Sequence, residues 1–203
     1  MMGKNFGPMY EEVIHLPFFL YDPRNPGNRT CDALTQTIDI AATLLDHFGI
    51  VPPDMDGVSL LQCMKDHTDA RETALFGVHG SFTCMCDKKY VYMRANIRKD
   101  NQPMIECTLM PTQMRGFIPK EAINQAEFVC GDAYSNGVSY LKIPMASHYD
   151  ASRFGDQLFD MIQDPKQQHN LVKEIDIQGF ENQLREALKR YHAPKEEFQR
   201  LGL

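Results

Sequence analysis

One strand–loop–helix unit near the start of the chain constrains its fold more than any other feature. Residues 13–22, VIHLPFFLYD, are mostly apolar, β-branched or aromatic, and they predict a buried strand of a mixed or parallel sheet. The Pro/Gly/Asn-rich residues 22–29 predict a surface loop. An apolar stripe at helical spacing then predicts a helix, formed by Leu34, Ile38, Ala41, Leu45 and Phe48. A parallel sheet needs several such units and none precedes this one, so we expect only the last part of a larger sheet.

The sequence pattern changes after about residue 67. Short β-type segments, TALFGVHGSFTCMC, KKYVYMRANI and MIECTLMP, predict an antiparallel meander, with SYLKIPM and QLFDMI as further strands. A final apolar face predicts a C-terminal helix, formed by Phe180, Leu184, Leu188 and Tyr191. We therefore expect an α/β protein with two parts. Residues 1–67 would be the remnant of a mixed α/β sheet domain, and residues 68–203 a small antiparallel sheet packed by a helix.

Composition excludes some classes of function. The chain has 203 residues, 24% of them charged, and a formal net charge of -6 with no basic stripe, which argues against a nucleic-acid partner. No apolar run is long enough to span a bilayer, so we expect no membrane partner. The chain shows no signal peptide, which favours the cytoplasm unless the start of the protein has been lost. Six thinly spread cysteines do not form a disulfide scaffold, and Cys84 and Cys86 are expected to pack on one face of a strand rather than bind metal.

Three segments, in this order and separation, resemble the C-terminal part of a type I, arylsulfatase-like sulfatase of the alkaline-phosphatase-like superfamily. They are GKNFGPMYEEVIHLPFFLYDPR, QTIDIAATLLDHFGIVPPDMDGVSLL and GDQLFDMIQDPKQQHNLV. The resemblance implies that residues 1–67 end the sulfatase α/β domain and that residues 68–203 form its C-terminal subdomain. It also implies a formylglycine and a calcium ion in the complete enzyme. Their motifs are absent here: the sequence has no Cys/Ser-x-Pro-x-Arg and no Asp-Asp pair, and Phe48 follows Asp46-His47 where the family has glycine.

The resemblance assigns one active-site residue, and the sequence offers two further candidates. Lys4, just before Tyr-Glu-Glu, matches the family lysine that contacts the sulfate group, although a lysine near a chain end is otherwise an ordinary solvated charge. His79, between Gly77 and Gly80, is a candidate substrate contact, with a strand-end histidine without a ligand as the alternative. Arg115 could bind a sulfate or carboxylate through its planar fork. Arg94 is a weaker candidate of the same kind, and a surface or intrachain ion pair is the default for both.

These expectations lead to one main hypothesis and two alternatives. The chain would be the C-terminal part of a sulfatase, inactive alone, whose partners are a missing N-terminal sulfatase portion and a sulfated small molecule or carbohydrate. Alternatively, it would be a stand-alone binding or interaction module, in which the exposed edge of an incomplete sheet would require a partner or self-association. A related phosphonate or phosphate ester hydrolase is the third reading, because the superfamily shares this architecture.

Overall fold

A four-stranded antiparallel sheet lies at the centre of the fold. The structure, a computed structural model, describes residues 8–24, 26–51, 54–66, 68–113, 116–146 and 149–203. The sheet has the order β1-β2-β3-β9, with β1 Ala74–Gly77, β2 Thr83–Cys86, β3 Tyr90–Arg94 and β9 Gln157–Asp160. The first three strands form the predicted meander. Strand β9 pairs with β3 in the register Val91↔Phe159 and Tyr92↔Leu158, about sixty residues later in the chain.

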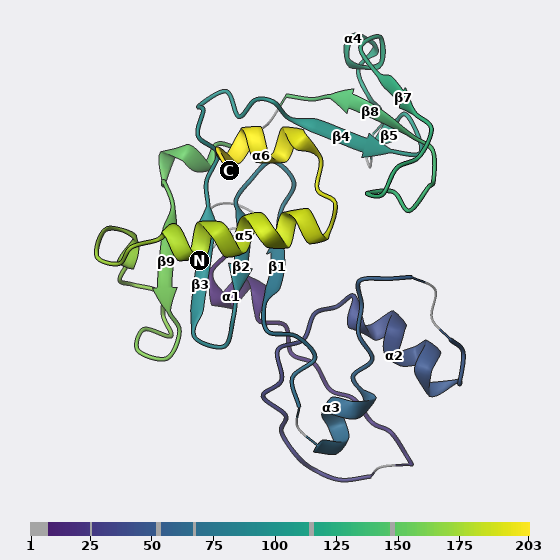
Figure 1. The fold of residues 1–203 in the computed structure, drawn as a ribbon, viewed down its shortest axis with the longest axis vertical. Coiled ribbons are helices and arrows are strands. Elements are labelled where there is room, and N and C mark those ends of the chain that lie inside the picture. The colour runs from purple at the N-terminus through teal and green to yellow at the C-terminus, as the bar shows by residue number, and fades with distance from the viewer. Residues whose placement is uncertain (1–7, 25, 52–53, 67, 114–115, 147–148) are drawn as a thin grey trace.

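Alternating side chains give this sheet two separate apolar faces, as the period of a strand requires. One face carries Cys84, Val91, Met93 and Phe159, and the N-terminal segment packs on it through Met9 and Tyr10. The other face carries Met85, Tyr92 and Leu158, covered by Leu184, Leu188 and Leu201. These last residues come from α5 (Gln178–Arg190) and α6 (Lys195–Leu201), which cross in front of the strands in Figure 1, while the short α1 (Glu11–Ile14) lies behind them. The expected C-terminal helix and the packing of Cys84 beside Cys86 are thus confirmed.

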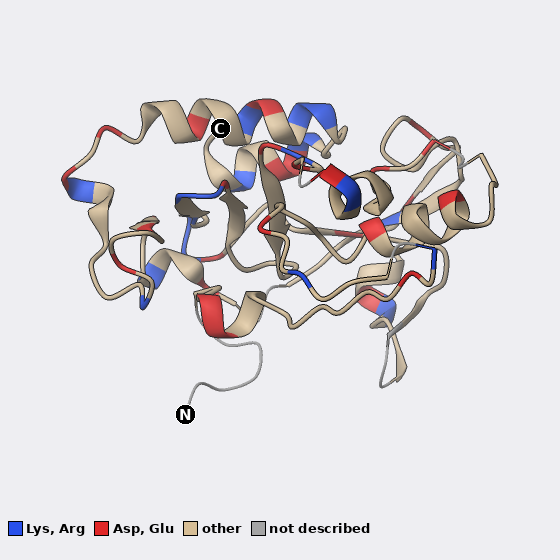
Figure 2. Ribbon diagram, turned by 90° about the horizontal axis from the view of Figure 1, so that it is seen from below, with Lys and Arg blue, Asp and Glu red and all other residues tan. Residues whose placement is uncertain are grey.

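The DPKQQHNLV segment connects this sheet to α5. The Asn170 side chain accepts hydrogen bonds from the backbone N–H groups of Leu158 (2.9 Å) and Val172 (3.1 Å), and donates one to the carbonyl of Asp156 (3.1 Å). One amide side chain therefore fixes β9 against the short 3-10 helix Leu171–Lys173, so the segment has a structural role. Figure 2 shows acidic and basic residues interspersed along the C-terminal helices. None of the described helices is long and apolar enough to cross a bilayer.

A second sheet projects from the body as an arm, at the upper right of Figure 1. It has the order β4-β8-β7, with β4 Ile105–Thr108, β7 Glu127–Val129 and β8 Tyr140–Pro144, and it carries α4 (Lys120–Ile123). A two-residue ribbon of β5 (Thr112–Gln113) and β6 (Gly116–Phe117) extends it. The sequence pattern correctly predicted β4 and β8 as strands. It was wrong in adding β4 to the meander, because β4 pairs instead with the distant β8.

The N-terminal lobe contains α2 (Asp39–His47) and α3 (Leu61–Asp66) and lies at the bottom of Figure 1. The fully buried Asp39 carboxylate stabilises this lobe. The carboxylate accepts hydrogen bonds from the backbone N–H groups of Gln36 and Val58 and pairs with Arg71. Gln36 also donates to the carbonyl of Leu75 at 2.8 Å, which ties the lobe to β1. The helix predicted over residues 34–48 is confirmed over a shorter range, and Gly49 follows it with a φ of 70°.

The predicted strand over residues 13–22 is wrong for this structure. Residues 11–14 form α1, and residues 16–21 form no element and make no backbone hydrogen bond to another described residue. A strand needs a neighbour to pair its N–H and C=O groups, and no neighbour is present beside this segment among the residues that the structure covers. The α/β class still holds, because helices and sheets share one core.

Candidate functional site

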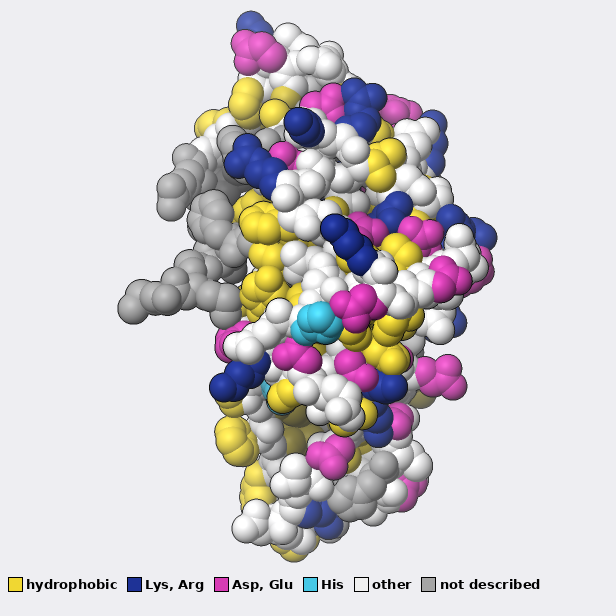
Figure 3. Space-filling model, turned by 90° about the vertical axis from the view of Figure 1, so that its left-hand side faces the viewer, with side chains coloured by type: hydrophobic (Ala, Val, Ile, Leu, Met, Phe, Trp, Pro, Cys, Tyr) yellow, Lys and Arg dark blue, Asp and Glu magenta, His cyan; other side chains and the backbone are white. Residues whose placement is uncertain are grey.

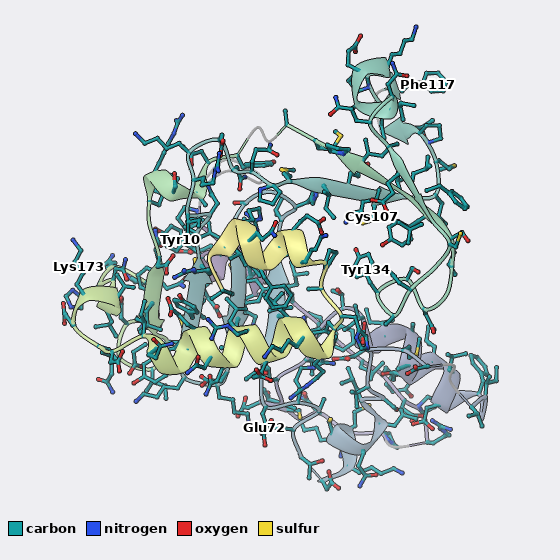
Figure 4. All side chains as sticks on the ribbon, turned by 45° about the horizontal axis from the view of Figure 1, so that its top comes forward. Tyr10, Glu72, Cys107, Phe117, Tyr134 and Lys173 are labelled. Atoms are coloured by element: carbon teal, nitrogen blue, oxygen red, sulfur yellow. The ribbon has the colours of Figure 1, made fainter. Side chains whose placement is uncertain are left out.

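A cleft opens where the arm meets the central sheet. Its volume is about 640 Å³, within the usual range for a small-molecule site. The walls come from the end of β1 and the turn that follows, from residues 103–107 leading into β4, from Tyr134, and from the start of α6. Figure 4 shows Cys107 on β4 and Tyr134 in the loop before β8 beside the space between the arm and the C-terminal helices.

Arg200 forms the polar floor of the cleft. Only 4% of this residue is exposed, and its guanidinium donates to the Ser81 carbonyl (3.0 Å), Asn101 Oδ1 (3.1 Å) and Thr83 Oγ1 (3.0 Å). It also contacts both carboxylate oxygens of Glu197, at 2.8 and 2.7 Å. Burial acts to raise the pKa of Glu197, but the hydrogen bonds and charge of Arg200 outweigh it, so the pKa lies below its ordinary value. Arg200 is therefore held by intrachain partners and has no donor left for a ligand.

A second ion pair joins the arm to α6. Lys142 Nζ on β8 lies 2.6 Å from Glu196 Oε1. Burial opposes ionisation of Glu196, yet the hydrogen bond from Lys142 keeps the pKa of the carboxyl below its usual value. Cys107, opposite Lys142 in the ladder, has a pKa raised by burial, so it is a thiol at neutral pH rather than a thiolate nucleophile.

His79 bridges the two sheets at the rim of the cleft. Its Nε2 lies 2.7 Å from the carbonyl oxygen of Ile105. Because a carbonyl only accepts, Nε2 must carry the proton, which leaves Nδ1 as an acceptor in the neutral ring. The flanking glycines are needed here: a Cβ at Gly77 would lie 2.5 Å from the Phe82 carbonyl oxygen, and Gly80 has a φ of 76°. His79 is thus exposed and held in place, and its role as a substrate contact stays a prediction.

The other predicted site residues are Lys4, Arg115 and Arg94. Lys4 and Arg115 lie outside the described residues. Arg94 lies inside the body, where it pairs with Asp156 and Glu181, each at 2.6 Å, and donates to the Leu201 carbonyl. The intrachain ion pair, our default for Arg94, is confirmed, and Arg94 is no part of the cleft.

Calcium requires six to eight oxygen ligands in one place. Within the described ranges, no three Asp, Glu, His or Cys side chains converge in a way that could hold a metal ion. These residues therefore do not fit the calcium site of a sulfatase, and we assign the ion no ligand among them.

The cleft residues on α6 could not be recognised from the sequence pattern. Glu196, Glu197 and Arg200 were not singled out, because a charged helix end usually faces solvent. One signal was present: Glu197 and Arg200 are three residues apart and so lie on one helix face. That spacing predicts a pair but not that the pair is buried.

Comparison with known proteins identifies the family. No curated protein matches this chain. A solved structure from Bacteroides thetaiotaomicron, titled "Metabolism of multiple glycosaminoglycans by bacteroides thetaiotaomicron is orchestrated by a versatile core genetic locus (BT33336S-sulf)", is similar with a TM-score of 0.42 and 16% identity. The match covers 77% of this chain and 24% of that chain, so this chain spans about a quarter of its length. The family model described as "N-sulphoglucosamine sulphohydrolase, C-terminal" matches residues 3–107, just over half of the sequence. The chain therefore belongs to the family of N-sulphoglucosamine sulphohydrolase C-terminal regions.

Proposed function

We propose that this chain is the C-terminal part of a sulfatase that hydrolyses sulfate esters, and that it acts only when joined to an N-terminal sulfatase portion. Hydrolysis needs an activated nucleophile and cationic groups that offset the charge on the sulfuryl oxygens. The family match supports a sulfatase origin. The sequence contains no Cys/Ser-x-Pro-x-Arg motif for formylglycine and no Asp-Asp pair for calcium. The nucleophile and the metal site would therefore come from the N-terminal portion.

The observation that carries this proposal is the exposed apolar segment Leu16–Tyr21. Phe19 is 93% exposed and Tyr21 is 77% exposed, and Leu16, Phe18 and Leu20 are each at least 41% exposed. Phe48 and Val51 add apolar surface at the end of α2, with 72% and 89% exposure. Figure 3 shows hydrophobic side chains reaching the surface in the lower part of the view, where the N-terminal lobe lies. Contiguous exposed apolar surface of this kind indicates a contact surface.

The backbone of the same segment supports the same conclusion. Its N–H and C=O groups make no hydrogen bonds to other described residues, so they can pair with a neighbouring strand. An extended, apolar and unpaired segment is what one strand of a larger sheet looks like without its neighbours. In this proposal the N-terminal portion supplies those neighbours, and the segment becomes the buried strand that the sequence pattern predicts.

The predicted site residues have defined roles in the joined enzyme. Lys4, seven residues before α1, would contact the sulfate group with its ammonium. Arg115 would bind a sulfate or carboxylate of the substrate through its planar fork. His79 would contact the substrate at the rim of the cleft. Lys4 and Arg115 are assigned from the sequence alone.

Association with the N-terminal portion tests the proposal. Phe19→Ser should weaken binding of an N-terminal sulfatase portion that carries the Cys/Ser-x-Pro-x-Arg motif by at least tenfold, measured by calorimetry. It should leave the stability of the isolated chain unchanged, because Phe19 makes few contacts there. Phe128→Ser is the matched control, since Phe128 is 64% exposed but lies on the arm. Equal binding by Phe19→Ser and the unmodified chain would rule out this contact surface.

A stand-alone binding module is the second candidate, favoured by one observation. The central sheet already has both faces covered by residues of this chain, so that part of the fold has its own core. A monodisperse monomer that binds sulfated ligands without any partner would support the module. Turnover of phosphate or phosphonate esters, but not of sulfate esters, by the joined enzyme would indicate the related hydrolase instead.

A further inference from the structure

Two cysteines meet in the N-terminal lobe, although they are 32 residues apart in the sequence. Cys31 lies before α2 in a stretch that forms no helix or strand, and Cys63 lies on α3, at the bottom of Figure 1. The Cys31 thiol donates a hydrogen bond to the backbone carbonyl of Cys63, with Sγ and the oxygen 3.6 Å apart. Both are free thiols. Because one residue supplies that carbonyl and the second thiol, the fold brings the two thiols into one neighbourhood.

The two thiols differ in their access to solvent. Cys31 is exposed, whereas only 5% of Cys63 is exposed. Burial, and secondly the neighbouring Cys31 sulfur, raise the pKa of the Cys63 thiol. The thiolate is the attacking species in thiol–disulfide exchange, so an oxidant in solution reacts first at Cys31. Cys63 then reacts with the sulfur that is held beside it. An accessible thiol next to a second, resolving thiol is the arrangement of a redox-sensitive pair.

The lobe holds Cys63 more firmly than Cys31. The residue before α3, Leu60, donates its backbone N–H to Thr43 Oγ1 on α2 at 3.0 Å, which fixes the start of α3 against α2. Residues 26–36, around Cys31, form no helix or strand. A disulfide needs Cα atoms about 4.4–6.8 Å apart, with the two Cβ atoms facing one another. The adjustment that this geometry requires therefore falls on the Cys31 side, where no ladder or helix has to break.

We propose that Cys31 and Cys63 form a reversible disulfide, with a small-molecule disulfide such as glutathione disulfide as the oxidant. The Cys31 thiolate attacks one sulfur of the oxidant, which forms a mixed disulfide and releases one glutathione thiolate. Cys63 then loses its proton and attacks Cys31 Sγ, which forms the protein disulfide and releases the second glutathione. Two protein thiols are oxidised and one glutathione disulfide is reduced to two thiols, so the electrons balance. A dithiol reductant reverses both steps.

The disulfide would act on the apolar surface of the lobe. The loop that it closes, residues 31–63, contains α2 and the exposed Phe48 and Val51. Closing this loop lowers the conformational entropy of the unfolded chain, so the oxidised lobe is the more stable form. The pair is a property of this chain alone and does not depend on sulfate hydrolysis or on an N-terminal portion.

Mass spectrometry of the isolated full chain tests the pair. The reduced chain is incubated with glutathione disulfide at pH 8, and the remaining thiols are blocked with N-ethylmaleimide. Trypsin leaves both cysteines in one peptide, residues 30–65, because no Lys or Arg lies between them. Cleavage before Asp32 then separates Cys31 from Cys63 unless a disulfide joins them. We expect this peptide to lose two hydrogen atoms, to stay joined after the second cleavage, and to be restored by dithiothreitol. A chain that stops at the mixed disulfide on Cys31 would overturn the proposal.

Variants assign the two steps. Cys63→Ala should stop the reaction at the mixed disulfide on Cys31, and Cys31→Ser should leave Cys63 unreacted. Cys130→Ser is the matched control, since Cys130 is exposed but follows β7 on the arm, and it should not change the reaction of peptide 30–65. A disulfide to Cys63 in the Cys31→Ser variant would refute the pairing.

Thermal unfolding provides an independent readout. The oxidised chain should have a Tm at least about 5 °C above that of the reduced chain, because the closed loop is long. Cys31→Ser should remove this difference, and it should fold normally because Cys31 is exposed. Equal Tm values for the reduced chain and the fully oxidised chain would contradict the stabilisation of the lobe.

Discussion

Packing of α5 against the central sheet can be tested by Leu184→Ala. Leu184 is 0% exposed and packs in one cluster with Met85, Tyr92, Leu158 and Leu188. The substitution removes three buried carbon atoms, worth about 2.4 kcal/mol at ~0.8 kcal/mol each. The cavity that remains adds about 1 kcal/mol, because strands and helix can collapse only partly. We expect a loss of about 3–4 kcal/mol in the free energy of unfolding, or about 10 °C in Tm for a chain of this length.

Denaturant unfolding followed by far-UV circular dichroism and tyrosine fluorescence measures this loss, since the sequence contains no tryptophan. Leu44→Ala is the matched control: the same change in a helix, at a residue 53% exposed on α2. It should shift stability by less than about 0.5 kcal/mol. A loss below about 1 kcal/mol for Leu184→Ala, or equal losses in the two variants, would refute the packing of α5 on the sheet.

Three further predictions concern other parts of the fold. In the native chain at pH 8, maleimide should label the exposed Cys31 first and the fully buried Cys84 only on unfolding. The reason is that burial shields the Cys84 thiol and raises its pKa. Early modification of Cys84, detected by mass spectrometry of labelled peptides, would contradict its burial. Asp39→Asn should lower the free energy of unfolding by about 3–5 kcal/mol and speed hydrogen exchange in α2, because it leaves the Arg71 charge buried without its partner. Unchanged hydrogen exchange would show that the Asp39–Arg71 pair does not fix the N-terminal lobe. Hydrogen bonds from Arg24 lower the pKa of Asp22 to about 2, so the stability that this carboxylate adds is present above its unfolded pKa near 4 and is lost as the pH falls towards about 2. Asp22→Asn should remove that part of the pH dependence. An acid titration of stability that is identical in the variant and the unmodified chain would contradict this prediction.

Local patterns in the sequence predicted where helices and strands form better than they predicted which strands pair. The period of two in the meander and the apolar face of α5 are properties of short windows, and both elements form as expected. The pairing of β4 with β8, and of β9 with β3, joins segments that are tens of residues apart, and no local pattern encodes that choice. The pattern over residues 13–22 predicted a strand that does not form, because the apolar character of a short window does not decide whether a neighbouring strand is present to pair with it.

The candidate site was predicted only in part, for a related reason. His79 could be singled out because glycines flank it. Arg200 and Glu197 could not, since burial of a charged helix end depends on where Ser81, Thr83 and Asn101 lie in three dimensions. The walls of the cleft come from segments that meet only in the folded chain, and no single stretch of sequence encodes it.

Turnover of an aryl sulfate tests the central claim most directly. The isolated chain is assayed beside the chain joined to an N-terminal sulfatase portion that carries the Cys/Ser-x-Pro-x-Arg motif, with formylglycine formation checked by mass spectrometry. We predict no turnover by the isolated chain, turnover by the joined form, and a loss of about 10²–10³ in kcat when Lys4 is replaced in Lys4→Ala. Turnover by the isolated chain, or an inactive joined form with complete formylglycine, would contradict the account.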